Sequence, residues 1–221
     1  LKLHNQPNLQ DKYLFFDFDG TICDTSEGIY KTFREVFPHY GLDVDESLYS
    51  RYIGPPLSDT FYSYFKDKDK AYEAVALFRS IYTTKYIGTT KLYDGIEESF
   101  RTLSAAGFKV CVATCKKHEE AVALLKKFGI YDYVTFTSGL CYNVRETKRE
   151  VLEYALNELG ATADECVMIG DTDFDVDGAA ECGMDCIVCK WGFGDYGNMK
   201  QKNIVFFAST PQQVVEFVTK E

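Results

Sequence analysis

The stretch that decides the fold is Tyr13-Leu14-Phe15-Phe16-Asp17-Phe18-Asp19-Gly20-Thr21. Its first six residues are apolar apart from Asp17, a pattern typical of a strand buried on both faces of a parallel sheet. Because side chains alternate along a strand, Asp17 and Asp19 are expected to point the same way. Ligands of open parallel sheets bind beyond the carboxyl ends of the strands, which is where this pair would lie.

Two neighbouring carboxylates at such an edge need a cation. They repel each other and lose hydration, and a divalent metal with oxygen ligands is the natural compensation. Gly20 then allows a sharp turn and brings backbone N–H groups close to a bound ligand. A lone pair of aspartates is common on solvated surfaces, so the signal is the pair placed directly after a buried strand.

The composition indicates a packed globular protein and limits its partners. The chain has 221 residues, of which 46% are hydrophobic and 15% aromatic, so it is expected to form one domain, or one domain carrying an inserted smaller one. The net charge of −10 argues against non-specific binding to nucleic acid or to an anionic membrane. No stretch is long enough to span a membrane, and Leu1 to Gln10 lack the apolar segment of a signal peptide, which predicts a cytoplasmic protein.

The cysteines admit two interpretations. Cys182, Cys186 and Cys189 have a spacing that could hold an iron–sulfur cluster. Cys186 and Cys189, however, stand at the two ends of an apolar run that is typical of a single strand. Side chains three residues apart on one strand would not converge on a cluster. We therefore expect reduced thiols packed in the core, as is common in cytosolic proteins.

The distribution of apolar residues predicts an α/β fold with a helical insertion. Residues 24–90 contain three stretches of helical spacing, the third from about Asp69 to Tyr86, and are expected to form an all-helical insertion directly after the first strand. Beyond Gly95, helices and strands alternate, which implies a parallel sheet covered by helices on both faces. Strands are expected at 108–113, 133–136, 166–169, 185–189 and 204–207, and helices at 96–106, 117–128, 147–159, 175–182 and 211–219.

Polar residues stand at or just beyond several of the expected strand ends. Thr114 is a hydroxyl donor where a helix N-terminus also favours an anion. Lys148 precedes a helix and could neutralise a phosphate oxygen, and Asp171 and Asp175 follow another strand. Taken singly, Thr114 reads as a helix cap and Lys148 as a surface lysine. At least two of the four aspartates at 171, 173, 175 and 177 are expected to be caps or solvent-facing charges. Together, the groups describe a Mg²⁺-assisted phosphoryl site.

These segments resemble the haloacid dehalogenase (HAD) superfamily. DFDGT at 17–21, the strand ending in Thr114, Lys148 and GDTDFD at 170–175 are similar to its four motifs, in order and spacing, over nearly the whole chain. The insertion, with RYIGPPL at 51–57 and WGFG at 191–194, resembles the subgroup that includes phosphoglycolate phosphatases. The resemblance implies a Rossmann-like α/β core at 1–22 and 91–221 and a helical cap domain at 23–90.

The resemblance also implies roles for individual residues. Asp17 matches the nucleophile that becomes an aspartyl phosphate, and Asp19 the acid/base that protonates the leaving alcohol and later activates water. Mg²⁺ is the implied cofactor and a small phosphorylated metabolite the implied substrate, with the protein a monomer or homodimer. The implied metal ligands are Asp17, Asp19 through its main-chain carbonyl, Asp171 and Asp175, and the implied substrate- and phosphate-binding residues are Gly20, Thr21, Thr114, Cys115, Lys148 and Arg51.

Several alternatives stay open at this point. Cys115 stands where Asn or Ser is common, and Lys116, or less plausibly Arg145, competes with Lys148 for the role of phosphate-binding cation. A phosphosugar mutase of the same family is the nearest enzyme alternative, although Thr21 favours hydrolysis. A dehalogenase fits less well, because it would have little use for Asp19. A receiver-like phosphoacceptor or a catalytically idle regulator is the alternative from another class. Phosphoglycolate is weakly favoured over nucleotides, sugar phosphates and pyrophosphate.

Overall fold

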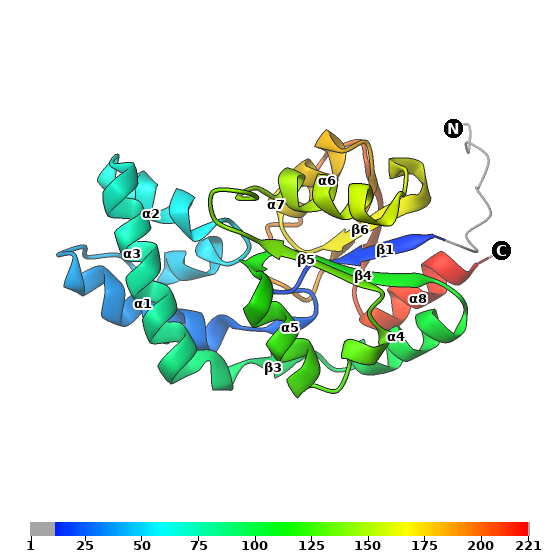
Figure 1. The fold of residues 1–221 in the computed structure, drawn as a ribbon, viewed down its shortest axis with the longest axis horizontal. Coiled ribbons are helices and arrows are strands. Elements are labelled where there is room, and N and C mark those ends of the chain that lie inside the picture. Colours follow the sequence, from blue (N-terminus) through cyan, green and yellow to red (C-terminus); the bar gives the residue numbers. More distant parts are fainter. Residues whose placement is uncertain (1–11, 221) are drawn as a thin grey trace.

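The computed structural model describes residues 12–220, so the N-terminal segment Leu1 to Gln10 lies outside the described residues. Its core is a six-stranded parallel sheet in the order β5-β4-β1-β6-β7-β8 (Figure 1). The strand β1 lies in the middle, where Tyr13 pairs with Lys109 on one side and with Cys166 on the other. The strands are β1 (Tyr13–Phe16), β4 (Lys109–Lys117), β5 (Phe136–Leu140), β6 (Cys166–Gly170), β7 (Asp185–Cys189) and β8 (Ile204–Ala208).

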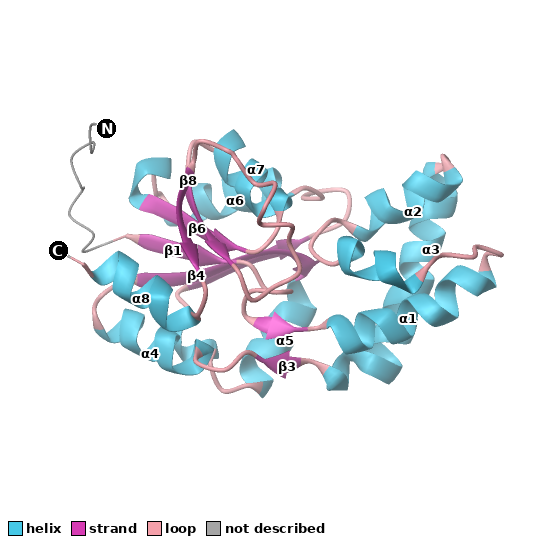
Figure 2. Ribbon diagram, turned by 180° about the vertical axis from the view of Figure 1, so that it is seen from behind, coloured by secondary structure: helices cyan, strands magenta, loops and turns pink. Residues whose placement is uncertain are grey.

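Helices cover both faces of the sheet (Figure 2). Leu14 and Phe16 face one layer and Phe15 faces the other, as alternation along a buried strand requires. The first layer contains α4 (Ile96–Ala105), α5 (His118–Lys127) and α8 (Pro211–Thr219), and the second contains α6 (Lys148–Leu159) and α7 (Asp173–Glu181). The predicted α/β class is thereby confirmed.

The segment between β1 and α4 forms the predicted helical cap. Its helices are α1 (Ser26–His39), α2 (Leu57–Phe65) and α3 (Lys68–Ile81), with short helical turns at Glu46–Tyr52, Tyr82–Tyr86 and Ile87–Thr89. They pack around aromatic rings, with the centroids of Phe33 and Phe78 4.8 Å apart. The short strands β2 (Cys23–Asp24) and β3 (Lys91–Leu92) pair antiparallel where the chain leaves and rejoins the core. We propose this pairing as the boundary of the cap at 23–90.

Two predicted elements are wrong in position. The strand expected at 133–136 is β5, and it begins only at Phe136, because residues Tyr131–Tyr133 form a short 3₁₀ helix. Its middle residues are Thr137-Ser138-Gly139, and Gly139 packs so closely on α5 that a Cβ atom would lie 2.5 Å from the Cα atom of His118. The third cap helix ends at Ile81 and gives way to a π-helical turn, so it does not continue to Tyr86.

Six of the eight cysteines are buried thiols, Cys186 and Cys189 among them, while Cys141 and Cys182 are partly exposed. All eight are free, and Cys186 and Cys189 lie on opposite faces of the sheet, where they cannot share a cluster. Across residues 12–220, none of the helices combines the length and the apolar run needed to cross a membrane.

Candidate active site

Asp17 and Lys148 form a buried ion pair at the carboxyl edge of the sheet. The backbone N–H of Asp17 donates to the Ile169 carbonyl at 2.8 Å, which fixes the residue as β1 ends. Lys148 Nζ donates to Asp17 Oδ1 at 2.6 Å and to the Ala113 carbonyl at 2.9 Å. Lys148 is the first residue of α6, and a capping box between Thr147 and Glu150 sets where that helix begins.

Three buried carboxylates meet beside this pair. Asp17, Asp171 and Asp175 each offer an oxygen, and these oxygens all lie within 4.8 Å of one another. Asp175 uses Oδ2 to accept the backbone N–H groups of Asp171 and Thr172 at 3.1 and 3.0 Å. Its Oδ1 turns towards the cluster and lies 2.7 Å from Lys148 Nζ. Asp173 and Asp177 are exposed, as the sequence predicted for two of the four.

The electrostatics of the cluster call for a further cation. Burial raises the pKa of Asp17 to about 7, with repulsion from Asp175 and Asp19 working against the lowering effect of Lys148. Burial, Asp175 and Asp17 likewise hold the pKa of Asp171 well above its usual range. One lysine does not balance three carboxylates, and clustered hard oxygens are the donors that Mg²⁺ prefers, with bonds of about 2.1 Å. The cluster therefore fits Mg²⁺.

Asp171 is enclosed by glycines and by the WGFG segment. Gly20 has a φ of +88°, and a Cβ atom there would lie 2.3 Å from Asp171 Oδ2, so only glycine fits. The backbone N–H of Phe193 donates to Asp171 Oδ2 at 2.7 Å, and the Thr21 hydroxyl donates to Oδ1 at 3.1 Å. Trp191 Nε1 donates to the Thr21 carbonyl at 3.0 Å. The sequence alone assigned no role to the WGFG segment at 191–194. In the structure, this segment packs around the Asp171 carboxylate.

Asp19 forms an ion pair with a second lysine, Lys116. Lys116 Nζ donates to Asp19 Oδ1 at 2.9 Å, and both side chains are largely buried. The sequence suggested a carboxylate as the neighbour of Asp19 and treated Lys116 and Lys148 as competitors for one role. The structure places both lysines in the site, one on each catalytic candidate. Arg145 lies apart from them, stacked on the Tyr154 ring at 3.9 Å.

Thr114 and Cys115 lie between the two lysines at the end of β4. Thr114 is buried, and its hydroxyl accepts the backbone N–H of Lys116 at 3.0 Å. Burial raises the pKa of Cys115 to about 12, so its thiol stays protonated at neutral pH.

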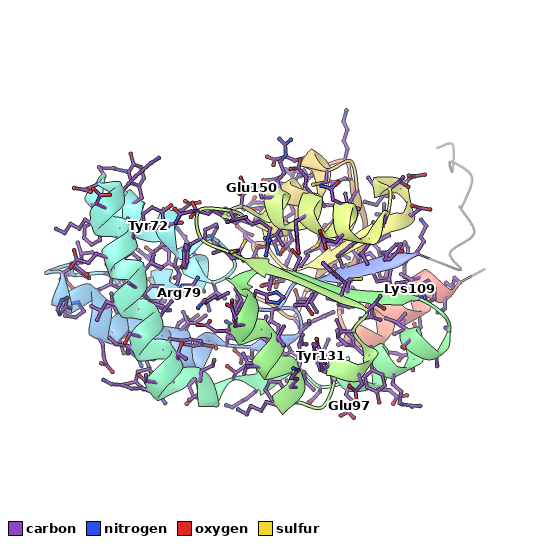
Figure 3. The ribbon with its side chains drawn as sticks, viewed as in Figure 1. Tyr72, Arg79, Glu97, Lys109, Tyr131 and Glu150 are labelled. Carbon is purple, nitrogen blue, oxygen red and sulfur yellow. The ribbon has the colours of Figure 1, made fainter. Side chains whose placement is uncertain are left out.

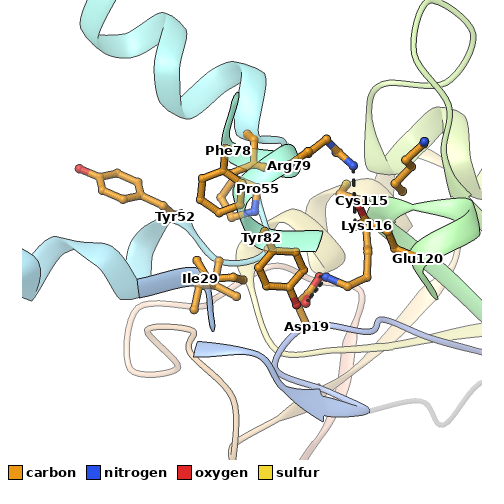
Figure 4. Close-up of a pocket in the computed structure, with 14 residues that line it drawn as sticks. Asp19, Ile29, Tyr52, Pro55, Phe78, Arg79, Tyr82, Cys115, Lys116 and Glu120 are labelled. Carbon is orange, nitrogen blue, oxygen red and sulfur yellow. Dashed lines mark hydrogen bonds and ion pairs between the residues drawn. The ribbon is translucent and has the colours of Figure 1, made fainter. Parts of the chain in front are cut away.

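A small cavity lies between the core and the cap at this edge (Figure 4). Its volume is about 50 Å³, and the cap closes directly on the core, since a Cβ atom on Gly54 would lie 2.9 Å from Thr172 Cγ2. Arg51 is exposed and is not among the residues that line the cavity, whereas Arg79 of α3 lines it. The core contributes Asp19, Cys115, Lys116, Lys117 and Glu120 to the lining, and the cap contributes Ile29, Tyr52, Ile53, Gly54, Pro55, Leu57, Phe78, Arg79 and Tyr82.

Comparisons with known proteins agree with this architecture. The chain is 32% identical to the tyrosine-protein kinase PtkA of Mycobacterium tuberculosis, over 96% of this chain and 74% of that protein. It is 33% identical to the pyrophosphatase PpaX of Halalkalibacterium halodurans, over 79% and 81%. A predicted phosphatase from Clostridium acetobutylicum superposes with a TM-score of 0.89 at 30% identity, covering 94% of this chain and 98% of that one. The family model for haloacid dehalogenase-like hydrolases matches residues 14–189, and the chain belongs to this enzyme family.

Proposed function

We propose that the protein is a Mg²⁺-dependent phosphatase that hydrolyses a small phosphorylated metabolite through an aspartyl phosphate on Asp17. One observation carries the proposal: three buried carboxylates and two buried lysines converge at one sheet edge, next to a cavity closed by the cap. The names of the relatives, a pyrophosphatase and a predicted phosphatase among them, support phosphoryl chemistry for this chain.

In the first half-reaction, an oxygen of Asp17 attacks phosphorus and the bond to the leaving oxygen breaks. Lys148 lies 2.6 Å from Asp17 and neutralises charge on the transferring group. Asp17, Asp171, Asp175 and the main-chain carbonyl of Asp19 would hold Mg²⁺. When bound, the ion supplies positive charge to the phosphoryl oxygens. The phosphoryl oxygens would be held by the groups around this point, Gly20, Thr21, Thr114 and Cys115.

Asp19 is the proposed acid and base of the two half-reactions. It faces the cavity, so in its protonated form it can donate to the leaving oxygen, and as a carboxylate it then takes a proton from the water that attacks the aspartyl phosphate. Lys116 holds its side chain in place between these steps. The cap limits the entry of bulk water while the ester is broken.

The proposal extends to the substrate, the location and the oligomeric state. The small cavity favours a small metabolite such as phosphoglycolate over the sugar bisphosphate handled by a phosphosugar mutase. Eight free cysteines support a cytoplasmic location. The protein is proposed to act as a monomer or homodimer, and a contact between Arg51 and substrate stays a prediction that needs the cap to move.

The test measures phosphate release by the purified chain with Mg²⁺ from acetyl phosphate and a panel of small phosphate esters. We expect EDTA to abolish turnover, added Mg²⁺ to restore it, and Asp17→Asn to lower kcat by about 10⁴-fold or more. Asp132→Asn, at an exposed position outside the site, is the control. Near wild-type turnover by Asp17→Asn would refute the nucleophile. Label transfer from ATP to a tyrosine peptide, without phosphate release from the panel, would favour the reaction that the name PtkA describes.

A further inference from the structure

Arg79 is a cap residue whose charged group faces the reaction centre. It lies in the last turn of α3, its side chain is 15% exposed, and it lines the cavity together with Asp19 and Lys116. Figure 3 shows it between the cap helices and the core strands, and Figure 4 shows it on the cap side of the cavity. A cation in this place is on the side of the substrate's leaving group, because Asp19 is the proposed proton donor to that group.

The guanidinium of Arg79 keeps its hydrogen-bonding capacity. Within residues 12–220, its Nε is buried and has no hydrogen-bond partner. Its ion pair with Glu120 is long, with Nη1 3.9 Å from Oε2, while the other oxygen of Glu120 accepts the Thr83 hydroxyl at 3.0 Å. The group is instead held by stacking, with its carbon 4.9 Å from the centroid of Tyr142. A planar donor group held this way is preorganised for a carboxylate or phosphate.

The charges around the cavity favour an anion on this side. Asp19 and Lys116 neutralise each other on the core wall. The other charged residues in the lining are Arg79, Lys117 and Glu120, which leaves the lining positive by one charge. Lys117 also lies 3.6 Å from Glu119, outside the lining, so Arg79 is the cation that faces the cavity without a close carboxylate. An anionic oxygen that reaches Arg79 satisfies a buried donor that has no acceptor in this arrangement.

The size of the cavity restricts what can carry this anion. Its volume of about 50 Å³ is well below the roughly 300 Å³ or more of sites that hold drug-sized ligands. A leaving group of a few non-hydrogen atoms fits beside Asp19 with the cap closed. With the cap in this position, the cavity favours such a leaving group over a sugar ring or nucleoside.

We propose that Arg79 is a specificity-determining residue, and that it selects small phosphate esters or anhydrides whose leaving group has its own negative charge. The charged group of the leaving group is a carboxylate or a second phosphate. The Arg79 guanidinium binds this group while Asp19 protonates the oxygen that bridges the leaving group to the transferred phosphorus. This inference rests on the proposed phosphatase reaction, which supplies the geometry of nucleophile, phosphorus and leaving group.

The experiment compares matched substrates with Mg²⁺ present. 2-Phosphoglycolate and pyrophosphate have anionic leaving groups, 2-hydroxyethyl phosphate has a neutral one of similar size, and phosphoethanolamine a cationic one. We expect the wild type to prefer an anionic substrate to the neutral one by about 10- to 100-fold in kcat/KM. Arg79→Gln should reduce this preference to a few-fold and leave the neutral substrate nearly unchanged, and Arg79→Lys should retain part of it. The two anionic substrates distinguish a carboxylate from a phosphate.

Arg34→Gln is the matched control, because Arg34 is an exposed cap arginine paired with Glu46 outside the cavity. It should keep the wild-type preference. Equal kcat/KM for anionic and neutral substrates, or an equal loss on all substrates in Arg79→Gln, overturns the role of Arg79 and leaves the phosphatase proposal standing. Release of no phosphate from any substrate overturns the phosphatase proposal instead. In that case a rise in Tm with 2-phosphoglycolate that Arg79→Gln abolishes supports anion binding by Arg79, and an unchanged rise refutes it.

Discussion

The buried side chains of the core and of the cap differ in kind. In the described part of the chain, the buried carboxylates all belong to the core, as do the buried lysines. The cap buries aromatic rings instead. For example, the ring centroid of Phe33 lies within 6.3 Å of the centroids of five other rings. The proposed reaction chemistry is therefore concentrated in the core, and the cap contributes shape and the cavity-lining guanidinium of Arg79. Loss of the proposed nucleophile Asp17 should affect every substrate, whereas loss of Arg79 should alter the order among substrates.

After Asp17→Asn, the largest expected effect comes from the core residue Asp19. Asp19→Asn removes the proposed proton donor, and we expect kcat for an alkyl phosphate to fall by about 10³-fold. Acetyl phosphate has a better leaving group that needs less protonation, so its first half-reaction should suffer much less. Rapid-quench measurement of aspartyl phosphate formation separates this step from hydrolysis of the intermediate. Equal losses in the formation rate for both substrates would show that Asp19 does not protonate the leaving group.

A smaller effect concerns the stability of the metal-free core. Because burial raises the pKa of Asp17 from 3.8 to about 7, the folded state binds more protons than the unfolded state between these values. Stability in EDTA should therefore decrease as pH rises from about 4 to 7 and level off above, by roughly 4 kcal/mol for Asp17 alone. The pKa of Asp171 is also raised by burial, so this residue should add to the same decrease.

Urea unfolding between pH 5 and 7.5 measures this decrease. Mg²⁺ should reverse it, because the ion binds the ionised carboxylates and so binds more tightly at higher pH. Asp17→Asn lacks the group and should show a flatter pH dependence in EDTA. Stability that rises over this interval in EDTA would contradict the electrostatics assigned to the cluster.

The smallest effect lies at the contact between the two regions. The Tyr72 hydroxyl of α3 donates to Glu146 Oε2 of the core at 2.7 Å, in an exposed position. Tyr72→Phe should lower the free energy of unfolding by less than about 1 kcal/mol, while KM rises a few-fold because the closed cap loses a hydrogen bond. The rise should be similar for all substrates, unlike that of Arg79→Gln. A substrate-dependent change would mean that Tyr72 influences selectivity as well as closure.

The core half of the site was predictable because strand topology dictates where its residues meet. Asp17, Asp171 and Lys148 each follow a strand end or open a helix, and a parallel sheet gathers such positions at one edge. Lys116 was harder, since a strand that ends in Thr114 does not reveal which of the next two side chains turns inward. Arg79 had no sequence signal. It occupies an ordinary helical position, and its role depends on how the cap docks, which depends on contacts remote in sequence.

The central position of β1 has a consequence for how the chain is made. The partners of Tyr13 are Lys109 and Cys166, so β1 leaves the ribosome well before either of the two strands that pair with it. The cap segment emerges in between and contains its own cluster of rings, which lets it fold before the sheet exists. An apolar, unpaired β1 is exposed during that interval, and early termination of synthesis beyond the cap would leave a fragment prone to aggregate.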